Sequence, residues 1–321
     1  MKRLLLAAMC AVYAGMIPAA HAAAPVPPAT VADPVQVRVG TYLLNLGRLD
    51  TGTGTYTMDV YISMTCDRPC DPTAFEIMNG RATERVMVDN KPRRKVFRLQ
   101  ASLSSEMDLR NYPFDTHMLG IVIEDGKLAA AGEVGQTTDD QIYLVEAAKS
   151  GIAPTVRVAG WEVNHLWRAT TTDVFYAPFG ETYSRYQFAV RIYRPVLSAV
   201  LKVVLPAIFL VIVGLVSLLL APDKVTQRLT VGTSALVGSV LLHLNLTSAI
   251  PPVGYLTFAD KFMLFNYVPL VLAIVASVVM LWFTDRAQTD RAHRVHVISG
   301  ISIPIIWVVL QGMNLLTLAA R

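Results

Sequence analysis

The sequence predicts a mixed fold, in which an antiparallel, Ig-like β-sandwich of about ten strands precedes an all-α domain of four transmembrane helices. Between residues 35 and 193, short segments of alternating apolar and polar residues are separated by clusters of Gly, Pro, Asp and Asn. Between residues 194 and 321, four apolar segments are each long enough to cross a bilayer as a helix. A content of 53% hydrophobic and 16% charged residues fits a chain that is part soluble and part membrane-embedded.

The N-terminus has the pattern of an export signal. Two basic residues precede the apolar run Leu4–Ile17, and Ala-His-Ala at 20–22 then supplies a small-x-small cleavage site. We expect a signal peptide at 1–22 and a flexible lead-in, rich in Pro and Ala, at 23–34. The domain at 35–193 is then exported.

Cys66 and Cys70 are the cysteines of the expected mature chain, because Cys10 leaves with the signal. In an oxidising compartment their C-x3-C spacing allows a short-loop disulfide, and a pair of reduced thiols is the alternative. No histidine lies near them in the sequence, so we do not expect a zinc site.

Alternating segments mark the strands of the exported domain, which at about 160 residues is large enough to bury its own core. The segments are Val35–Leu49, Thr55–Thr65, Arg94–Leu103, His117–Glu124, Ile142–Glu146, Glu162–Thr170 and Tyr183–Tyr193. Within the expected hairpin at 173–181, three aromatic residues and one acid gather, namely Phe175, Tyr176, Phe179 and Glu181. Such a tip can cage a small cation, or its rings can pack on the sandwich or a neighbouring subunit.

The four apolar spans are expected at Val196–Leu220, Leu229–Ile250, Phe262–Phe283 and Val295–Leu318. An exported first domain places the start of the first span outside, and four crossings return the C-terminus outside. Basic residues agree with this orientation, because both expected inner loops are rich in Arg and Lys, whereas the outer loop carries only Lys261. We therefore expect a multi-pass membrane protein with its N-terminal domain and C-terminus outside.

The second span carries a polar stripe. Thr226, Thr230 and Ser234 recur every four residues and share one helical face, which continues through Val237, Leu241, Leu244 and Ser248. Several copies around an axis would enclose a pore with hydroxyl rings and an apolar constriction. The alternative is that the hydroxyls bond to their own helix or join helices together.

Other function classes find no support in the sequence. It contains no G-x-S-x-G, H-E-x-x-H or Walker pattern, so we expect no enzyme, cofactor or metal site. A net charge of +4 gives no reason to expect nucleic acid as a partner. Asp260, at the edge of a span, is the nearest approach to an intramembrane carboxylate, which argues against a proton-coupled pump.

Five sequence strings together resemble the prokaryotic members of the pentameric ligand-gated ion channel family, over nearly all of the mature chain. They are DLRNYPFDTHML at 108–119, SGIAPTVRVAGWEV at 150–163, YSRYQFAVRIYRP at 183–195, VVLPAIFLVIVG at 203–214 and TSAIPPVGYLTFADKFML at 247–264. The cysteines that flank the YPFD-type turn in eukaryotic members are absent here, as is usual in bacterial members.

The resemblance implies a homopentamer gated by a small molecule or by protons, with permeant ions and membrane lipid as its other partners. It also implies a bacterial inner membrane as the location, with the N-terminal domain and the C-terminus in the periplasm. The second helix would line the pore, with Val237 and Leu241 as the gate, and the hairpin at 173–181 would cap the ligand site between subunits. Asp115 would pair with Arg194 and couple ligand binding to helix tilt. The coupling residues implied are Pro113, Phe114, Asp115, Arg194, Pro251 and Pro252.

Ion selectivity rests on the inner mouth of the pore. Cation-selective members carry an acid beside the basic residue there, whereas here Gln227 precedes Arg228 and the nearest acid is Asp223. A ring of Asp223 would concentrate cations, and a ring of Arg228 would oppose this. Cation conduction is favoured because most bacterial relatives conduct cations. The alternative function is a non-conducting, membrane-anchored periplasmic binding or signalling protein.

Overall fold

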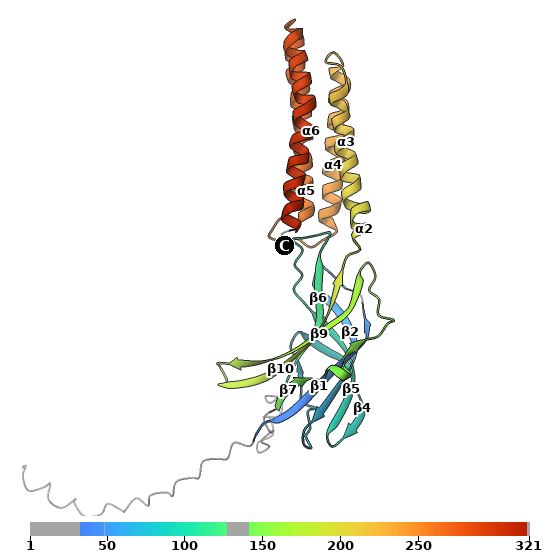
Figure 1. Ribbon diagram of the computed structural model, residues 1–321, viewed down its shortest axis with the longest axis vertical. Coiled ribbons are helices and arrows are strands. Elements are labelled where there is room, and N and C mark those ends of the chain that lie inside the picture. Colours follow the sequence, from blue (N-terminus) through green and yellow to red (C-terminus); the bar gives the residue numbers. More distant parts are fainter. Residues whose placement is uncertain (1–32, 48, 127–140, 320–321) are drawn as a thin grey trace, which may run out of the picture. The chain divides into compact units, whose positions relative to one another are not determined.

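The computed structural model describes residues 33–47, 49–126 and 141–319. In this part of the chain a strand-rich domain precedes four long helices, which confirms the predicted fold class (Figure 1). The expected signal peptide lies outside the described residues, as does the lead-in up to residue 32. The strands are β1 (Val35–Leu46), β2 (Thr55–Cys66), β3 (Glu76–Ile77), β4 (Gly80–Lys91), β5 (Arg94–Ser104), β6 (Thr116–Glu124), β7 (Gln141–Val145), β8 (Gly151–Ile152), β9 (Glu162–Tyr176) and β10 (Glu181–Tyr193).

The strands form two sheets. One has the order β4-β5-β2-β1-β7, with β8 also paired to β1, and the other has the order β3-β6-β10-β9. Most neighbours are antiparallel, as predicted, but β7 and β8 run parallel to β1. β7 follows β6 of the other sheet, and β8 follows β7 along the same edge of β1 after the short helix η1 (Ala147–Lys149). Neither strand is joined to β1 by a hairpin, as parallel pairing requires.

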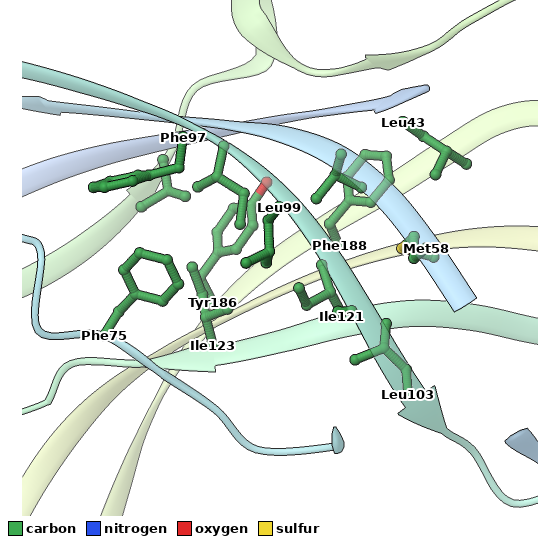
Figure 2. Close-up of a cluster of buried hydrophobic side chains, with 14 of the residues drawn as sticks. Leu43, Met58, Phe75, Phe97, Leu99, Leu103, Ile121, Ile123, Tyr186 and Phe188 are labelled. Atoms are coloured by element: carbon green, nitrogen blue, oxygen red, sulfur yellow. The ribbon is translucent and has the colours of Figure 1, made fainter. Parts of the chain in front are cut away.

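A single hydrophobic core draws on both sheets (Figure 2). Every second residue of β2 from Met58 to Met64 is at most 1% exposed, and so is every second residue of β10 from Tyr186 to Ile192. Because successive side chains of a strand point to opposite faces, one face of each sheet supplies this core.

The strand β4 is not predicted by the sequence pattern. Its residues are exposed on both faces except for Asp89, which is half-buried, so no alternation marks it. It is an edge strand, held by its pairing with β5. β9 also continues past its predicted end at Thr170, because its threonine-rich continuation pairs with β10 as far as Tyr176.

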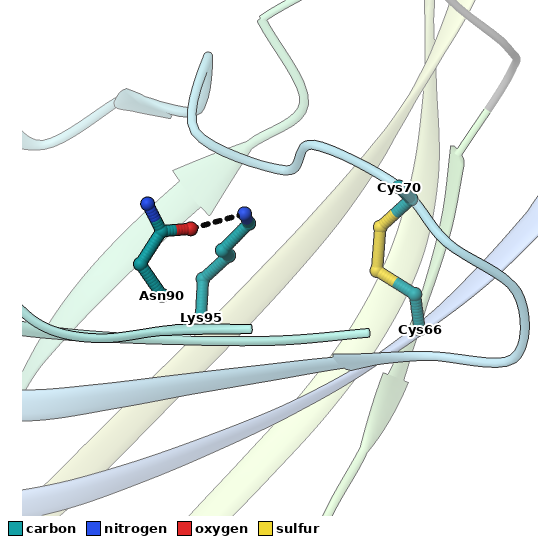
Figure 3. Close-up of a disulfide and its surroundings, with 4 residues drawn as sticks. All are labelled: Cys66, Cys70, Asn90 and Lys95. Atoms are coloured by element: carbon teal, nitrogen blue, oxygen red, sulfur yellow. Dashed lines mark hydrogen bonds between the residues drawn. A yellow bond between two sulfur atoms is a disulfide. The ribbon is translucent and has the colours of Figure 1, made fainter. Parts of the chain in front are cut away.

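Cys66 and Cys70 are joined by a disulfide (Figure 3). Their α-carbons lie 6.2 Å apart, a separation that such a bond spans. The backbone N–H groups of Cys66 and Cys70 donate to the carbonyl groups of Arg93 and Pro92. The loop after β2 is thereby tied to the turn between β4 and β5.

Four helical segments follow the sandwich, each long and apolar enough to span a membrane. The later three begin before the predicted apolar spans, because their first turns are polar. The first segment contains a π-helical turn just before Pro206, a residue that lacks the N–H group of a regular helix. The first segment, Val196–Leu219, consists of α2 (Val196–Ala199), η2 (Val200–Val204), α3 (Leu205–Val216) and η3 (Ser217–Leu219). The others are α4 (Val225–Ser248), α5 (Phe258–Thr284) and α6 (Thr289–Ala319).

Candidate functional site

The polar stripe of α4 lies on the exposed face of the helix. In the apolar middle of the stripe, Val237 is 58%, Leu241 62% and Leu244 61% exposed. The other stripe residues, Thr226, Thr230, Ser234 and Ser248, are exposed as well. Among the described residues, the other helices thus leave most of this face uncovered.

Two hydroxyl groups of the stripe bond back to their own helix. Thr230 Oγ1 donates to the carbonyl of Thr226 at 2.9 Å, and Ser248 Oγ donates to that of Asn245 at 2.8 Å. Each hydroxyl then keeps its lone pairs on the exposed face, where they can accept hydrogen bonds from water.

The opposite face of α4 packs inside the chain. Gly232, Ala235 and Ser239 are buried there. A Cβ atom on Gly232 would lie 3.1 Å from Ile274 of α5, and one on Gly238 would lie 2.9 Å from Leu210 of α3. The glycines of α4 thus serve close packing within one chain.

Arg228 lies on this packing face and is 1% exposed. Its guanidinium donates to the carbonyl of Leu220 at 2.6 Å, to Ser277 Oγ at 3.3 Å and to His296 Nδ1 at 3.1 Å. A cation at the C-terminal end of a helix is stabilised by the free carbonyl groups there, which accounts for its burial. The expectation of an Arg228 ring at the inner mouth therefore needs correction, since the side chain points away from the exposed face. Gln227 and Asp223 are exposed, and Asp223 lies 3.5 Å from Lys224.

The exposed faces of the other three segments are different in kind. In the middle of these spans the exposed large side chains are apolar. They are Phe209, Ile212 and Val213 on α3, Val271, Val275 and Val278 on α5, and Ile301, Ile305 and Val308 on α6. Such faces suit contact with lipid, whereas the hydroxyl-bearing face of α4 suits contact with water.

Asp115 and Arg194 form an ion pair where the sandwich meets the helices. Arg194 Nε donates to Asp115 Oδ1 at 2.7 Å, and the Asp115 side chain is 0% exposed. The guanidinium also lies over the rings of Trp161, at 4.3 Å, and Tyr112, at 5.1 Å. His117 Nε2 lies 2.7 Å from the second carboxylate oxygen, Asp115 Oδ2.

The loop that carries Asp115 caps helix α5. The first N–H groups of a helix have no partner within it, and here Phe258 and Ala259 donate theirs to the carbonyl groups of Arg110 and Tyr112, at 2.8 and 3.0 Å. Phe114 packs edge-on against Phe258, with 5.4 Å between ring centroids. Pro113, which follows a cis peptide bond, lies between these contacts.

The loop between α4 and α5 meets the same region of the sandwich. Tyr255 accepts a hydrogen bond from the Leu109 backbone at 2.9 Å. Pro251 and Pro252 line an open cavity of about 230 Å³ together with the β1–β2 turn at 51–54 and residues 105–107. The implied coupling residues are therefore brought together from three separate stretches of sequence.

The β9–β10 hairpin contributes to a second cavity of about 230 Å³. It is lined by Glu76, Met78, Glu124, Asp125, Tyr176, Phe179 and Tyr183. Of the expected ligand residues, Tyr176 and Phe179 line it, but Phe175 and Glu181 do not. Neighbours on a strand point to opposite faces, so Phe175, which is 62% exposed, turns away where Tyr176 turns in.

Carboxyl groups that the sequence analysis does not single out give this cavity an acidic character. Glu124 pairs with Arg185 and accepts a hydrogen bond from the Tyr176 hydroxyl at 3.1 Å. Burial, and then the hydrogen bond that Tyr183 donates to Glu181, raise the pKa of Tyr183 to about 12, so this phenol stays neutral. The acids come from β3 and the end of β6, and only the sheet topology brings them to the hairpin.

Comparison with known proteins gives two relatives, both ion channels. No protein-family model matches the chain. A proton-gated ion channel of Gloeobacter violaceus is 21% identical over 310 residues, which cover 88% of this chain and 83% of that protein. A pH-sensitive chloride channel of Anopheles gambiae is 23% identical over 171 residues, 51% of this chain and 26% of the insect protein. The chain is thus a homologue of ion channels, with four helices able to span a membrane.

Proposed function

We propose that the chain is a member of the pentameric ligand-gated ion channel family and forms a homopentamer that is gated by protons or a small ligand, with α4 lining the pore. The names of both relatives link channel activity to protons or pH. The sandwich would lie in the periplasm and the helices in the inner membrane, with lipid around α3, α5 and α6.

The observation that carries this proposal is the contrast between exposed faces. The exposed face of α4 bears hydroxyl groups at both ends and large apolar side chains at Val237, Leu241 and Leu244. The exposed faces of the other segments are apolar in mid-span. Within a membrane, a polar helix face is favourable only where it contacts water. Five copies of α4 around an axis would enclose a water-filled pore, and the hydroxyl-bearing face would line it.

The alternative is a receptor whose helices associate without conducting. Helix association in membranes uses small residues at close contact. Gly232 and Gly238 are of this kind, but they contact Ile274 and Leu210 of their own chain. The middle of the exposed stripe has large residues instead, which favours a lined path over a tight helix seam.

We expect the pore to prefer cations, although few charged side chains near the inner end of α4 enforce this preference. The burial of Arg228 removes its charge from the exposed face, so it no longer opposes cations there. Asp223 is the acid nearest the inner end of α4, and Lys224 partly neutralises it. We therefore expect weak selectivity for cations over anions.

A proton is the first agonist to test, and a small amine is the second. The acidic, aromatic cavity beside the hairpin suits an organic cation, because Tyr176 and Phe179 offer ring faces beside Glu76 and Glu124. Binding of such a cation beneath the hairpin tip would shift the protein toward the conformation that binds the cation more tightly.

The experiment is current recording from purified protein in planar bilayers, with steps of pH, a panel of small amines and asymmetric salt. We expect unitary currents that increase in acid, and a reversal potential on the cation side. Val237→Ser should open more readily, because a hydroxyl eases wetting of the apolar constriction. Silence from verified pentamers, including the Val237→Ser variant, would instead favour the non-conducting receptor.

A further inference from the structure

The described histidines differ sharply in their surroundings. His165 on β9 and His293 on α6 are exposed, and His296 accepts a hydrogen bond from Arg228. His243 is half-buried between α4 and α5, where it contacts Asp260 at 3.2 Å and Tyr267 at 2.9 Å. His117 alone among the described histidines is almost fully buried, at 5% exposed.

His117 shares one carboxylate with Arg194. The two oxygens of Asp115 are divided between them, at 2.7 Å from His117 Nε2 and 2.7 Å from Arg194 Nε. Both partners also contact the same ring, since the imidazole meets Trp161 edge-on at 5.3 Å between centroids and the guanidinium lies over it at 4.3 Å. An imidazole whose Nε2–H donates to Asp115 has Nδ1 free to take a proton.

The charges that face His117 come from three directions. Asp115 ends the loop directly before β6, and Arg194 directly follows β10. The loop contributes Tyr112, whose phenol is neutral because burial raises its pKa. Glu162, at the start of β9, is exposed and interacts with Tyr193. With neutral His117 the Asp115–Arg194 pair is balanced, whereas a protonated imidazole adds an uncompensated positive charge to a buried cluster.

We propose that His117 is the proton-binding site of the channel, and that its protonation displaces Arg194 from Asp115. This inference rests on the proposed function and names its agonist site. Protonated His117 competes for the carboxylate, so acid favours the conformation in which Arg194 has left it. Because Asp115 belongs to the loop that caps α5, and Arg194 leads directly into α2, this exchange reaches the start of two helical segments at once.

The first test compares the pH dependence of ion flux through the full chain in lipid vesicles. His117→Gln keeps an N–H donor for Asp115 but cannot take a proton. We expect it to shift the pH of half-activation by at least one unit, a tenfold change in proton concentration. His165→Gln, on the exposed face of β9, is the matched control and should leave the profile unchanged. A pH-gated parent with an unaltered His117→Gln profile, or a shift in His243→Gln instead, would overturn the proposal.

A second readout does not depend on conduction. The fluorescence of Trp161, taken as the difference between parent and Trp161→Phe protein, should be quenched in a single step as the pH is lowered, because a protonated imidazole then contacts the indole ring. The same difference in a His117→Gln background should lack this step. If the protein conducts no ions but still shows the change in Trp161 fluorescence, the proposed channel function is wrong and the proton site is supported. A flat Trp161 signal in the parent would refute the site, whether or not the protein conducts.

Discussion

At the scale of single residues, the Asp115–Arg194 pair is the contact that we propose couples the two halves of the chain. The carboxylate is fully buried and the guanidinium is 23% exposed. Breaking one side of such a pair leaves a buried charge without its partner, which costs far more than losing an exposed pair. Both residues adjoin contacts to the helices, so their loss should affect gating as well as stability.

We predict that Asp115→Asn lowers the free energy of unfolding by about 3 kcal/mol. Arg194→Gln should cost less in the Asp115→Asn background than alone, because the pair is already broken. Thermal unfolding of the solubilised protein measures both effects, and ion flux measures gating. Arg98→Gln, which breaks an exposed pair with Asp59, is the control and should change little. If the losses in free energy of unfolding from Asp115→Asn and Arg194→Gln are additive, and both variants gate like the parent, the proposed coupling role of the pair is contradicted.

At the scale of elements, the helices are held by close approach at small residues. Gly214 of α3 is buried, and a Cβ atom there would lie 2.1 Å from Leu270 Cδ2 of α5. Leu270 is itself 0% exposed, so it has little room to move away. Gly312 of α6 has open space at the same atom.

Gly214→Ala should therefore destabilise the protein, by about 1–3 kcal/mol, because overpacking forces α3 and α5 apart. Gly312→Ala should instead be neutral or stabilising by up to about 1 kcal/mol, because alanine has the higher helix propensity. The unfolding temperatures of the two variants, measured side by side, test this difference. Equal effects would show that α3 and α5 are not packed as described.

The elements differ in how well the sequence predicts them. The long helices are evident because about twenty consecutive apolar residues have few alternatives to a membrane span. Strands that bury one face are evident from alternation, as in β2 and β10. β4 is missed because both of its faces are exposed, and its place depends on β5. The direction of β7 and β8 is missed because pairing partners are not encoded in a local pattern.

The candidate sites show the same division. The stripe of α4 is predictable, because helical periodicity alone places its residues on one face. The burial of Arg228 is not, because it depends on the end of α3 and on His296 of α6. The acids of the hairpin cavity and the contact of His117 with Asp115 likewise depend on three-dimensional proximity or on burial that single-sequence patterns do not reveal.

At the scale of the whole molecule, the account predicts an assembly in which one exposed helix face meets water and the others meet lipid. Leu241 of α4 and Val308 of α6 make a matched pair for testing this, because they are 62% and 61% exposed and both apolar. In a single chain they are equivalent surfaces. In the proposed pentamer the first lines the pore and the second faces the membrane.

The most direct measurement is therefore the effect of a charged, membrane-impermeant thiol reagent on currents through Leu241→Cys and Val308→Cys channels, with the parent as the background. We predict that the reagent blocks open Leu241→Cys channels and leaves Val308→Cys currents unchanged. Equal effects on the two variants, or unblocked current through Leu241→Cys channels whose thiol is shown to be modified, would contradict a pore lined by α4.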